Sequence, residues 1–358
     1  MNASSWRILS DDLTGALDSA AAWAGAAEVP VFLDQPGTSA QAVQAVVTGT
    51  RDVPPTQLQS LLSPSLDWFT STGLAFKKID SLLRGNSLTE IAWLMQSGRF
   101  DGAVFAPAFP AQGRFTAQDR HWVAPPHTPQ GPRSHEFAGS LTQALAAVGL
   151  SARTCERMPE HLPSSKGAVL IPDVLNDHDL DQLATLAAQP QARRWLWCAS
   201  AGLAWALARR DGLANAAPAP TTPATGTVLL LTASRHPVLR AQLHQLGPVR
   251  HPLELIDLAA PEPLSADAAH QRLTQAMQHI VATHVRPERL LVVGGDTLLA
   301  LCRAAAVHSL QASASPRAGW GCARLSGGPW DGLLCYSRSG AFGPADDLGA
   351  LLATLLTR

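Results

Sequence analysis

Several features that would place this chain in a special class are missing from its sequence. Charged residues make up only 15% of it, and the formal net charge is −1, so no positive excess points to nucleic acid or to a membrane surface. No uninterrupted apolar stretch could span a bilayer, and the first residues lack the pattern of a secretory signal. The five cysteines include no CxxC pair. We therefore expect a cytoplasmic protein with reduced, mostly buried thiols.

Three catalytic motifs are also missing. The twelve histidines include no HExxH or similar spacing, so we predict no metal held by histidines. No GxxxxGK[ST] phosphate loop occurs, and no GxGxxG follows the first expected strand, which argues against a nicotinamide dehydrogenase. His121 lies beside Arg120 in a proline-rich stretch; it could touch a ligand, but we interpret it as a surface residue.

The sequence does contain the pattern of an α/β fold. It has 358 residues, of which 46% are hydrophobic, so two domains with buried cores can form. Short β-like runs alternate with helical stretches, which predicts parallel sheets flanked by helices. The strands are expected at residues 6–10, 29–34, 45–50, 74–80, 102–109, 168–174, 228–234 and 289–293, and the clearest helices at 14–26, 87–98, 199–210 and 237–246.

Composition suggests where the domains divide. Residues 215–227, rich in Pro, Ala and Thr, are predicted to link a first domain at 1–214 to a second at 228–358, each with a mainly parallel sheet. Residues 110–137 are rich in Pro, Gln, Gly and His and are predicted to form a long loop or lid. The apolar final helix is expected to pack on the first domain or on a partner. In the second case the protein would form a homo-oligomer.

The segment SDDLTGA, residues 10–16, places two adjacent carboxylates between an expected strand and an expected helix. Ligands of such folds bind at the carboxyl ends of strands, where helix N-termini also offer unpaired N–H groups. In the simplest interpretation, Asp11 caps the helix while the other aspartate stays solvated. Alternatively, Asp11 or Asp12 meets a ligand hydroxyl or a metal ion. These residues alone leave both interpretations open.

A second polar group follows the strand expected at residues 74–80. In FKKIDSLLRGN, strand alternation places Lys78 and Asp80 on one face and Lys77 on the other. The guanidinium of Arg84 can bind a carboxylate or a phosphate with two hydrogen bonds. The alternative is a solvated polar turn.

The second half contains three glycine- or serine-rich turns that follow strands. In LLVVGGDTLLAL, an apolar strand leads into Gly294 and Gly295, and a helix is expected from Asp296. Glycines let a phosphate approach the backbone, and a helix N-terminus favours its charge. TASRHP at 232–237 and SRSGAFG at 337–343 are similar turns. Together they indicate a nucleotide pocket, although each alone could be an ordinary connection.

These motifs resemble those of the four-carbon acid sugar kinases, which are two-domain bacterial enzymes. The resemblance covers essentially the whole chain. The matching segments in the first half are DDLTGA, TGTR, KKIDSLLRGN and APAFPAQGR. Those in the second half are ASRHPVLRAQ, GGDT and RSGAFG. The second half departs from the family pattern at Ala233, Leu239, Asp296 and Arg338, where Gly, Thr, Glu and Lys are usual.

The resemblance implies a sugar-binding N-terminal domain and a nucleotide-binding C-terminal domain. Such enzymes transfer the γ-phosphoryl group of ATP to a hydroxyl of a threonate, an erythronate or an oxo-tetronate, and Mg²⁺ is expected with the ATP. We take Asp12 as the general base that accepts the hydroxyl proton, with Asp80 as its rival. The residues expected at the acid-sugar site are Asp11, Asp12, Arg51, Lys78, Asp80, Ser81, Leu82, Leu83 and Arg84. Those expected at the ATP site are Ser234, Gly294, Gly295, Asp296, Thr297 and Gly340.

Two other functions stay open. The altered second half is also compatible with a sugar-acid-binding or regulatory protein whose ATP site has decayed. GGDT also resembles the GGDG loop of kinases that phosphorylate NAD or lipids, but Thr297 replaces the third glycine and the N-terminal half is unrelated.

Overall fold

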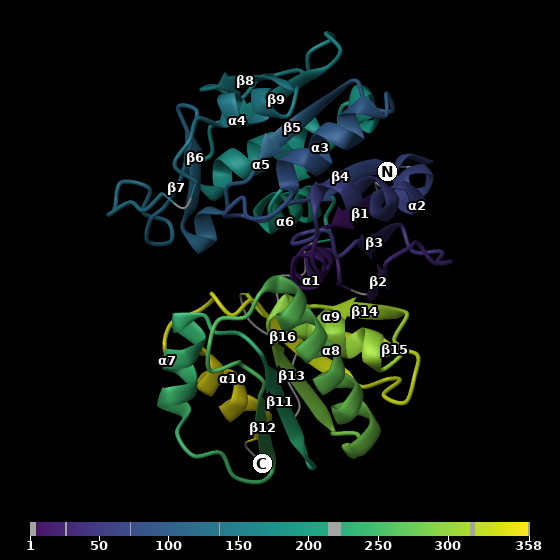
Figure 1. Ribbon diagram of the computed structural model, residues 1–358. Coiled ribbons are helices and arrows are strands. Elements are labelled where there is room, and N and C mark those ends of the chain that lie inside the picture. The colour runs from purple at the N-terminus through teal and green to yellow at the C-terminus, as the bar shows by residue number, and fades with distance from the viewer. Residues whose placement is uncertain are drawn as a thin grey trace. The chain divides into compact units, whose positions relative to one another are not determined.

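The computed structural model describes residues 5–25, 27–71, 73–135, 137–213, 223–315 and 319–356. The chain forms two compact units (Figure 1). The first consists of Met1–Trp23 with Asp34–Ala214, and the second of Ala24–Leu33 with Asn215–Arg358. Most of the linker predicted at 215–227 lies outside the described residues. The predicted assignment of sugar and nucleotide to separate domains stays a prediction.

The first unit is built on a parallel sheet. Its strand order is β3-β1-β4-β10-β5-β9-β8, and every neighbouring pair is parallel, as the strand–helix alternation predicted. The central strands are Val-, Leu- and Ala-rich and buried along their length, as expected for strands covered on both faces. The bounds are β1 (Trp6–Ser10), β3 (Val43–Val47), β4 (Leu74–Lys78), β5 (Gly102–Ala106), β8 (Ser151–Cys155), β9 (Ala168–Pro172) and β10 (Trp195–Ala199).

Helices cover this sheet. The helix α1 packs on β1 and contacts α6, which in turn contacts α5, whereas α2 packs against β1 and β4. The predicted loop or lid at 110–137 instead contains an antiparallel hairpin of β6 (Arg114–Ala117) and β7 (Arg120–Val123). The helices are α1 (Leu13–Ala21), α2 (Leu58–Ser71), α3 (Ser87–Gln96), α4 (Leu141–Ala147), α5 (Asp177–Leu186) and α6 (Ala201–Arg210), with 3₁₀ turns at Pro55–Gln57, Pro110–Gln112 and Pro190–Arg194.

The second unit has a mixed sheet, so the prediction of a mainly parallel one is corrected here. In the order β12-β11-β13-β16-β15-β14-β2, the first four strands are parallel and the remaining pairings are antiparallel. Among the described residues, the connections between β14, β15 and β16 contain no crossover helix, and these strands alternate in direction. The bounds are β2 (Val29–Leu33), β11 (Val228–Thr232), β12 (Leu253–Asp257), β13 (Arg289–Val293), β14 (Ser309–Ser313), β15 (Gly321–Ser326) and β16 (Leu334–Arg338).

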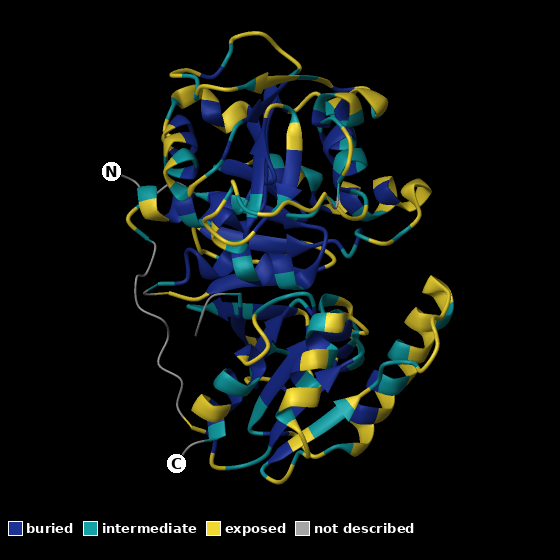
Figure 2. Cartoon of the chain, turned by 90° about the vertical axis from the view of Figure 1, so that its left-hand side faces the viewer, coloured by how far each residue is buried: buried dark blue, intermediate teal, exposed yellow. Residues whose placement is uncertain are grey.

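Two pairs of helices pack in the second unit, α7 with α10 and α8 with α9 (Figure 1). The final helix, α10, places Leu348, Leu351, Leu352 and Leu355 in the core beneath the sheet, so its apolar face is covered within its own unit. The exposed residues of the helices lie on their outer faces, while the strands are largely buried (Figure 2). The helices are α7 (Pro237–Leu246), α8 (Ala266–Thr283), α9 (Gly295–Ala304) and α10 (Asp347–Leu356).

Candidate functional site

The two adjacent aspartates lie at the carboxyl end of β1, and both are buried. Asp12 is the N-cap of α1: its backbone is extended, and its Oδ1 accepts a 3.1 Å hydrogen bond from the Gly15 N–H. The hydroxyl of Thr14 donates to Oδ2 of the same carboxylate at 2.5 Å. Asp12 therefore caps the helix, so the simplest expectation, that Asp11 is the cap, is wrong. Asp11 is buried and paired with Arg51.

Arg51, which follows β3, binds both carboxylates. Its Nε donates to Asp11 Oδ2 at 2.9 Å, and its Nη2 donates to Asp11 Oδ1 at 3.2 Å and to Asp12 Oδ1 at 2.7 Å. The same Nη2 lies 3.7 Å from Asp80 Oδ1. One guanidinium thus joins the ends of three neighbouring strands, β3, β1 and β4, because parallel strands present their carboxyl ends at one edge.

The turn Asp80–Arg84, called the acid loop below, closes around its first residue. Asp80 Oδ2 accepts hydrogen bonds from the backbone N–H groups of Leu82 at 3.2 Å and Arg84 at 3.1 Å. The Arg84 side chain adds a two-point contact, Nε to Oδ2 at 2.8 Å and Nη2 to Oδ1 at 2.7 Å. Leu83 has a φ of 58°, the left-handed region that side chains rarely adopt.

These contacts keep the buried carboxylates charged. Burial raises the pKa of Asp12, but the charges of Arg51 and Lys78 outweigh it, and the net pKa is lowered. For Asp80, burial is likewise overcome by the Arg84 hydrogen bonds and the Arg51 charge, which hold its pKa well below the usual range. The same carboxylates raise the pKa of Arg51.

The two lysines at the end of β4 contact different helices. Lys78 Nζ donates to the Ile79 carbonyl at 2.9 Å, and it lies so close to α1 that a Cβ on Gly15 would approach it to 2.6 Å. Lys77 Nζ lies 2.5 Å from Glu90 Oε2 of α3, and both side chains are fully buried. Lys78 thus belongs to the cluster of charges, whereas Lys77 forms a structural ion pair.

Two residues of this site were not predicted from the sequence. Asn86 Nδ2 donates to the carbonyls of Thr50 at 2.8 Å and Val53 at 2.7 Å, which fixes the segment carrying Arg51. His121 is buried and lies 2.7 Å from the Ser81 carbonyl, so the interpretation of His121 as a surface residue is wrong. Asn86 could have been found as a side chain able to cap a turn next to Gly85. No local pattern signals a contact between positions 81 and 121.

In the second unit, the ends of β11, β13 and β16 bring four predicted nucleotide residues together. A Cβ on Gly340 would lie 2.3 Å from Ser234 Oγ, and one on Gly294 would lie 3.0 Å from Thr297 Oγ1 and 4.0 Å from Ser234 Cβ. Gly294 also has a φ of 122°, which glycine adopts without strain. Gly295 and Asp296 form the first turn of α9, where Asp296 is exposed.

Arg338 is buried. It forms an ion pair with Asp347 at 3.3 Å, stacks over Trp320 at 4.7 Å, and donates to the Phe342 carbonyl and to Gln242. Gln242 in turn donates to the carbonyl of Pro344 at 2.6 Å. Arg338 therefore supports the turn that contains Gly340 from inside the unit.

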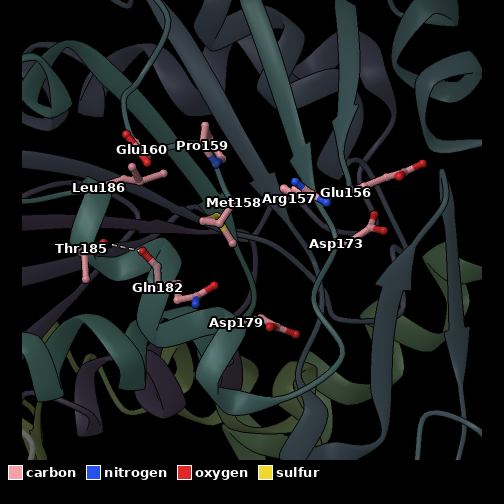
Figure 3. A pocket seen from close by; sticks show the side chains of 10 residues that line it. All are labelled: Glu156, Arg157, Met158, Pro159, Glu160, Asp173, Asp179, Gln182, Thr185 and Leu186. Atoms are coloured by element: carbon pink, nitrogen blue, oxygen red, sulfur yellow. Dashed lines mark hydrogen bonds between the residues drawn. The ribbon is translucent and has the colours of Figure 1, made fainter.

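A separate hollow of about 450 Å³ opens in the first unit near α5 (Figure 3). Its lining contains none of the predicted site residues. Four of its side chains are acidic, and burial, with a smaller contribution from the neighbouring carboxylates, raises the pKa of one of them, Asp173. This lining disfavours an anionic ligand. The lining residues are Glu156, Arg157, Met158, Pro159, Glu160, Asp173, Asp179, Gln182, Thr185 and Leu186.

Among the described residues, no group of three or more His, Cys, Asp or Glu side chains could hold a metal ion. Within the same part of the chain, no helix is both long and apolar enough to cross a bilayer.

Comparison with known proteins shows a family match. The model of a sugar-binding N-terminal domain matches residues 6–207, more than half of the chain. A D-threonate kinase of Bordetella bronchiseptica is 27% identical over 95% of both chains. A D-threonate kinase of Cupriavidus necator is 33% identical over 64% of this chain and 60% of its own.

Solved structures resemble the whole fold. A protein from Salmonella typhimurium LT2 has a TM-score of 0.70 at 16% identity, with 95% of this chain and 97% of that one covered. A Haemophilus influenzae protein has a TM-score of 0.63 at 14% identity and the same coverage. At these identities the likeness shows the fold alone.

Proposed function

The chain belongs to the four-carbon acid sugar kinase family, and from this premise we propose that it transfers the γ-phosphoryl group of ATP to a hydroxyl of a four-carbon acid sugar. The relatives named D-threonate kinases support this substrate class, and they make D-threonate the first acid to test. The substrate complex on the nucleotide side is ATP with Mg²⁺.

The observation that carries the proposal is the buried charge cluster of the first unit. Asp11, Asp12 and Asp80 face Arg51 and Arg84 at the carboxyl edge of the sheet. Buried charges are costly unless they are paired, so a fold that needs only stability gains little from such a set. A polyhydroxy acid can bind to protein groups of both charges. Its hydroxyls donate hydrogen bonds to carboxylates, and its own carboxylate binds cations.

Arg84 and Lys78 are the cations suited to the carboxylate of the substrate. The Arg84 side chain is 49% exposed and makes its contacts to Asp80 through Nε and Nη2. Among the described residues, Arg84 Nη1 has no protein partner, which leaves two N–H donors for a ligand. Lys78 uses one of its three donors on the Ile79 carbonyl.

Asp12 is the better placed of the two candidate bases. Asp80 accepts four hydrogen bonds, three on Oδ2 from Leu82 N, Arg84 N and Arg84 Nε and one on Oδ1 from Arg84 Nη2, and its Oδ1 also lies 3.7 Å from Arg51 Nη2, so both of its oxygens face cations or N–H groups of the protein. Asp12 Oδ2 accepts one bond, from Thr14, which leaves a lone pair for the acceptor hydroxyl. We therefore assign Asp12 as the group that takes the hydroxyl proton and Asp80 as the residue that orients Arg84.

The nucleotide phosphates are assigned to the second unit. The N-terminus of α9 favours anionic groups, and three strand ends meet near it. The residues we assign there are Ser234, Gly294, Gly295, Asp296, Thr297 and Gly340. Phosphoryl transfer depends mainly on alignment and charge neutralisation, so the chain need not supply a covalent nucleophile.

An ADP-release assay with ATP and Mg²⁺ tests the proposal. The panel contains D- and L-threonate, D- and L-erythronate and their oxo derivatives, with erythritol and threitol as controls that keep the hydroxyls but lack the carboxylate. We expect turnover with at least one acid and none with either alditol. Thermal stabilisation by an acid but not by ATP, without turnover, would instead identify a binding protein with a decayed nucleotide site.

A further inference from the structure

His121 connects the β6–β7 hairpin to the acid loop. The histidine lies on β7, and its side chain is 1% exposed. Its Nε2 is 2.7 Å from the Ser81 carbonyl oxygen, and its Nδ1 is 2.9 Å from the Thr116 hydroxyl of β6. A segment about 40 positions away in the sequence thus contacts the turn that carries Asp80 and Arg84.

The direction of both hydrogen bonds follows from the chemistry of the partners. A carbonyl oxygen can only accept, so the His121 Nε2 carries the proton and donates to Ser81. Burial lowers the pKa of His121 to about 4, which keeps the ring neutral near pH 7 and leaves Nδ1 without a proton. The Thr116 hydroxyl therefore donates to Nδ1 and fixes this tautomer.

The acid loop needs an external contact because its own hydrogen bonds fix only its inner side. Asp80 holds the N–H groups of Leu82 and Arg84, and the Leu83 N–H donates to the Asp80 carbonyl at 3.0 Å. The left-handed backbone of Leu83 is unfavourable for a residue with a side chain, so it persists only where its surroundings hold it. The bond from His121 holds the next carbonyl along the chain.

We infer that His121 is a positioning residue for acid-sugar binding: its Nε2–H fixes the Ser81 carbonyl and thereby the direction in which the acid loop presents Arg84 and Asp80. This inference rests on the proposed function for its ligand. Its structural part, that the loop is held through Ser81, can be measured without any substrate.

Two substitutions separate the hydrogen bonds of His121. The amide N–H₂ of His121→Gln reaches about as far as Nε2 and can still donate to Ser81. The shorter His121→Asn matches Nδ1 and keeps only the Thr116 side. The matched control is His127→Asn, at an exposed histidine of the same 110–137 segment. Its φ of 56° suits asparagine.

The first measurement is steady-state kinetics with each substrate varied. We expect His121→Asn to raise the KM for the acid at least tenfold and to leave the KM for ATP within twofold. His121→Gln should keep the acid KM within about threefold of the original protein, and His127→Asn should change neither KM. Equal acid KM values for the Asn and Gln variants, or parallel changes in both KM values, would overturn the inference.

The second measurement is amide hydrogen exchange of the peptide that covers residues 80–86, made without ligands. The peptide should exchange at least tenfold faster in His121→Asn than in His121→Gln, while exchange of the β1 and β5 peptides stays unchanged. Identical exchange in the two variants refutes the role of Ser81 whatever the enzyme does. A difference in exchange together with no turnover on any acid supports the loop contact and rejects the proposed function instead.

Discussion

Arg51 holds Asp11 with two parallel hydrogen bonds, 2.9 Å from Nε to Oδ2 and 3.2 Å from Nη2 to Oδ1. The Asp11 side chain is completely buried, and that of Arg51 is 18% exposed. Asp11 therefore fixes the plane of the guanidinium, and the plane places Nη2 against Asp12. Lysine cannot reproduce this contact because its ammonium has no planar fork.

Arg51→Lys is expected to lower kcat/KM for the acid at least 100-fold. It should also reduce the free energy of unfolding by about 1–3 kcal/mol, because the buried carboxylates lose part of their hydrogen bonding. Urea denaturation and steady-state kinetics measure the two effects. The matched control is Arg194→Lys, whose fork binds Asp101 with Nη2 to Oδ1 at 2.8 Å but is 60% exposed. The loss of stability in Arg194→Lys should be smaller than in Arg51→Lys because water screens an exposed ion pair, and equal losses at the two positions would contradict the expectation.

Gly15→Ala should be harmful although alanine is the better helix former. The new Cβ would lie 2.4 Å from Asp12 Oδ1 and 2.6 Å from Lys78 Nζ, so it would displace the capping carboxylate and the lysine. We expect a loss of roughly 1–3 kcal/mol in unfolding free energy and at least a tenfold fall in kcat/KM. Gly349→Ala in α10, where a Cβ meets nothing within 4 Å, should instead stabilise by about 0.5–1 kcal/mol. Stabilisation by both changes would show that the space beside Gly15 is not restricted.

Asp18 of α1 provides a prediction of pH dependence. Burial raises its pKa to about 6, partly offset by the Lys78 charge and a hydrogen bond from Trp205. Between about pH 4 and 6, Asp18 therefore binds more protons in the folded protein than in the unfolded chain. For this reason the free energy of unfolding falls as the pH rises through that range. Asp18→Asn should therefore be more stable than the original protein at pH 7, by about 1 kcal/mol after allowance for partial exposure, and no more stable at pH 4. Urea unfolding at both pH values decides this; a gain independent of pH would have another cause.

His121 has the opposite effect on stability. Its pKa is about 4 in the folded protein and ordinarily 6.5, so the unfolded chain binds more protons between these values. Stability should fall by roughly 3 kcal/mol from this group as the pH drops from 6.5 to 4. His121→Gln cannot titrate, so its unfolding free energy should fall less steeply over the same range. Parallel curves for the two proteins would mean that His121 is already charged in the fold.

Gly340→Ala tests the nucleotide assignment. The added Cβ would lie 2.3 Å from Ser234 Oγ and 3.0 Å from Ser234 Cβ, so the ends of β11 and β16 must move apart. The KM for ATP should rise at least tenfold, while acid binding measured by calorimetry stays the same. Gly349→Ala is again the control, since it lies in the same unit away from this turn. A rise in the acid dissociation constant with an unchanged KM for ATP would reverse the assignment.

Local sequence signals predicted much of the fold. The apolar run before Asp11 and the glycines after β13 each mark a boundary that neighbouring residues set by themselves, whereas the choice of Asp12 over Asp11 as the helix cap was not predicted. Parallel pairing in the first unit followed from the same alternation, because a parallel strand needs a crossover. The mixed pairing of β14, β15 and β16 was missed, since their short runs carry no sign of strand direction.

The sequence by itself identified the residues to which we assign the chemistry: the motifs around Asp12, Arg51 and Asp80, which lie next to strand ends. Only the tertiary structure decided how they are used. Arg51 reaches Asp11 across 40 positions, His121 reaches Ser81 across 40, and Arg338 faces Asp347 in the core. Such contacts depend on the order of strands in the sheet and on which side chains become buried. Neither is set by residues close together in the chain, because the free energy that selects them comes from packing the whole unit.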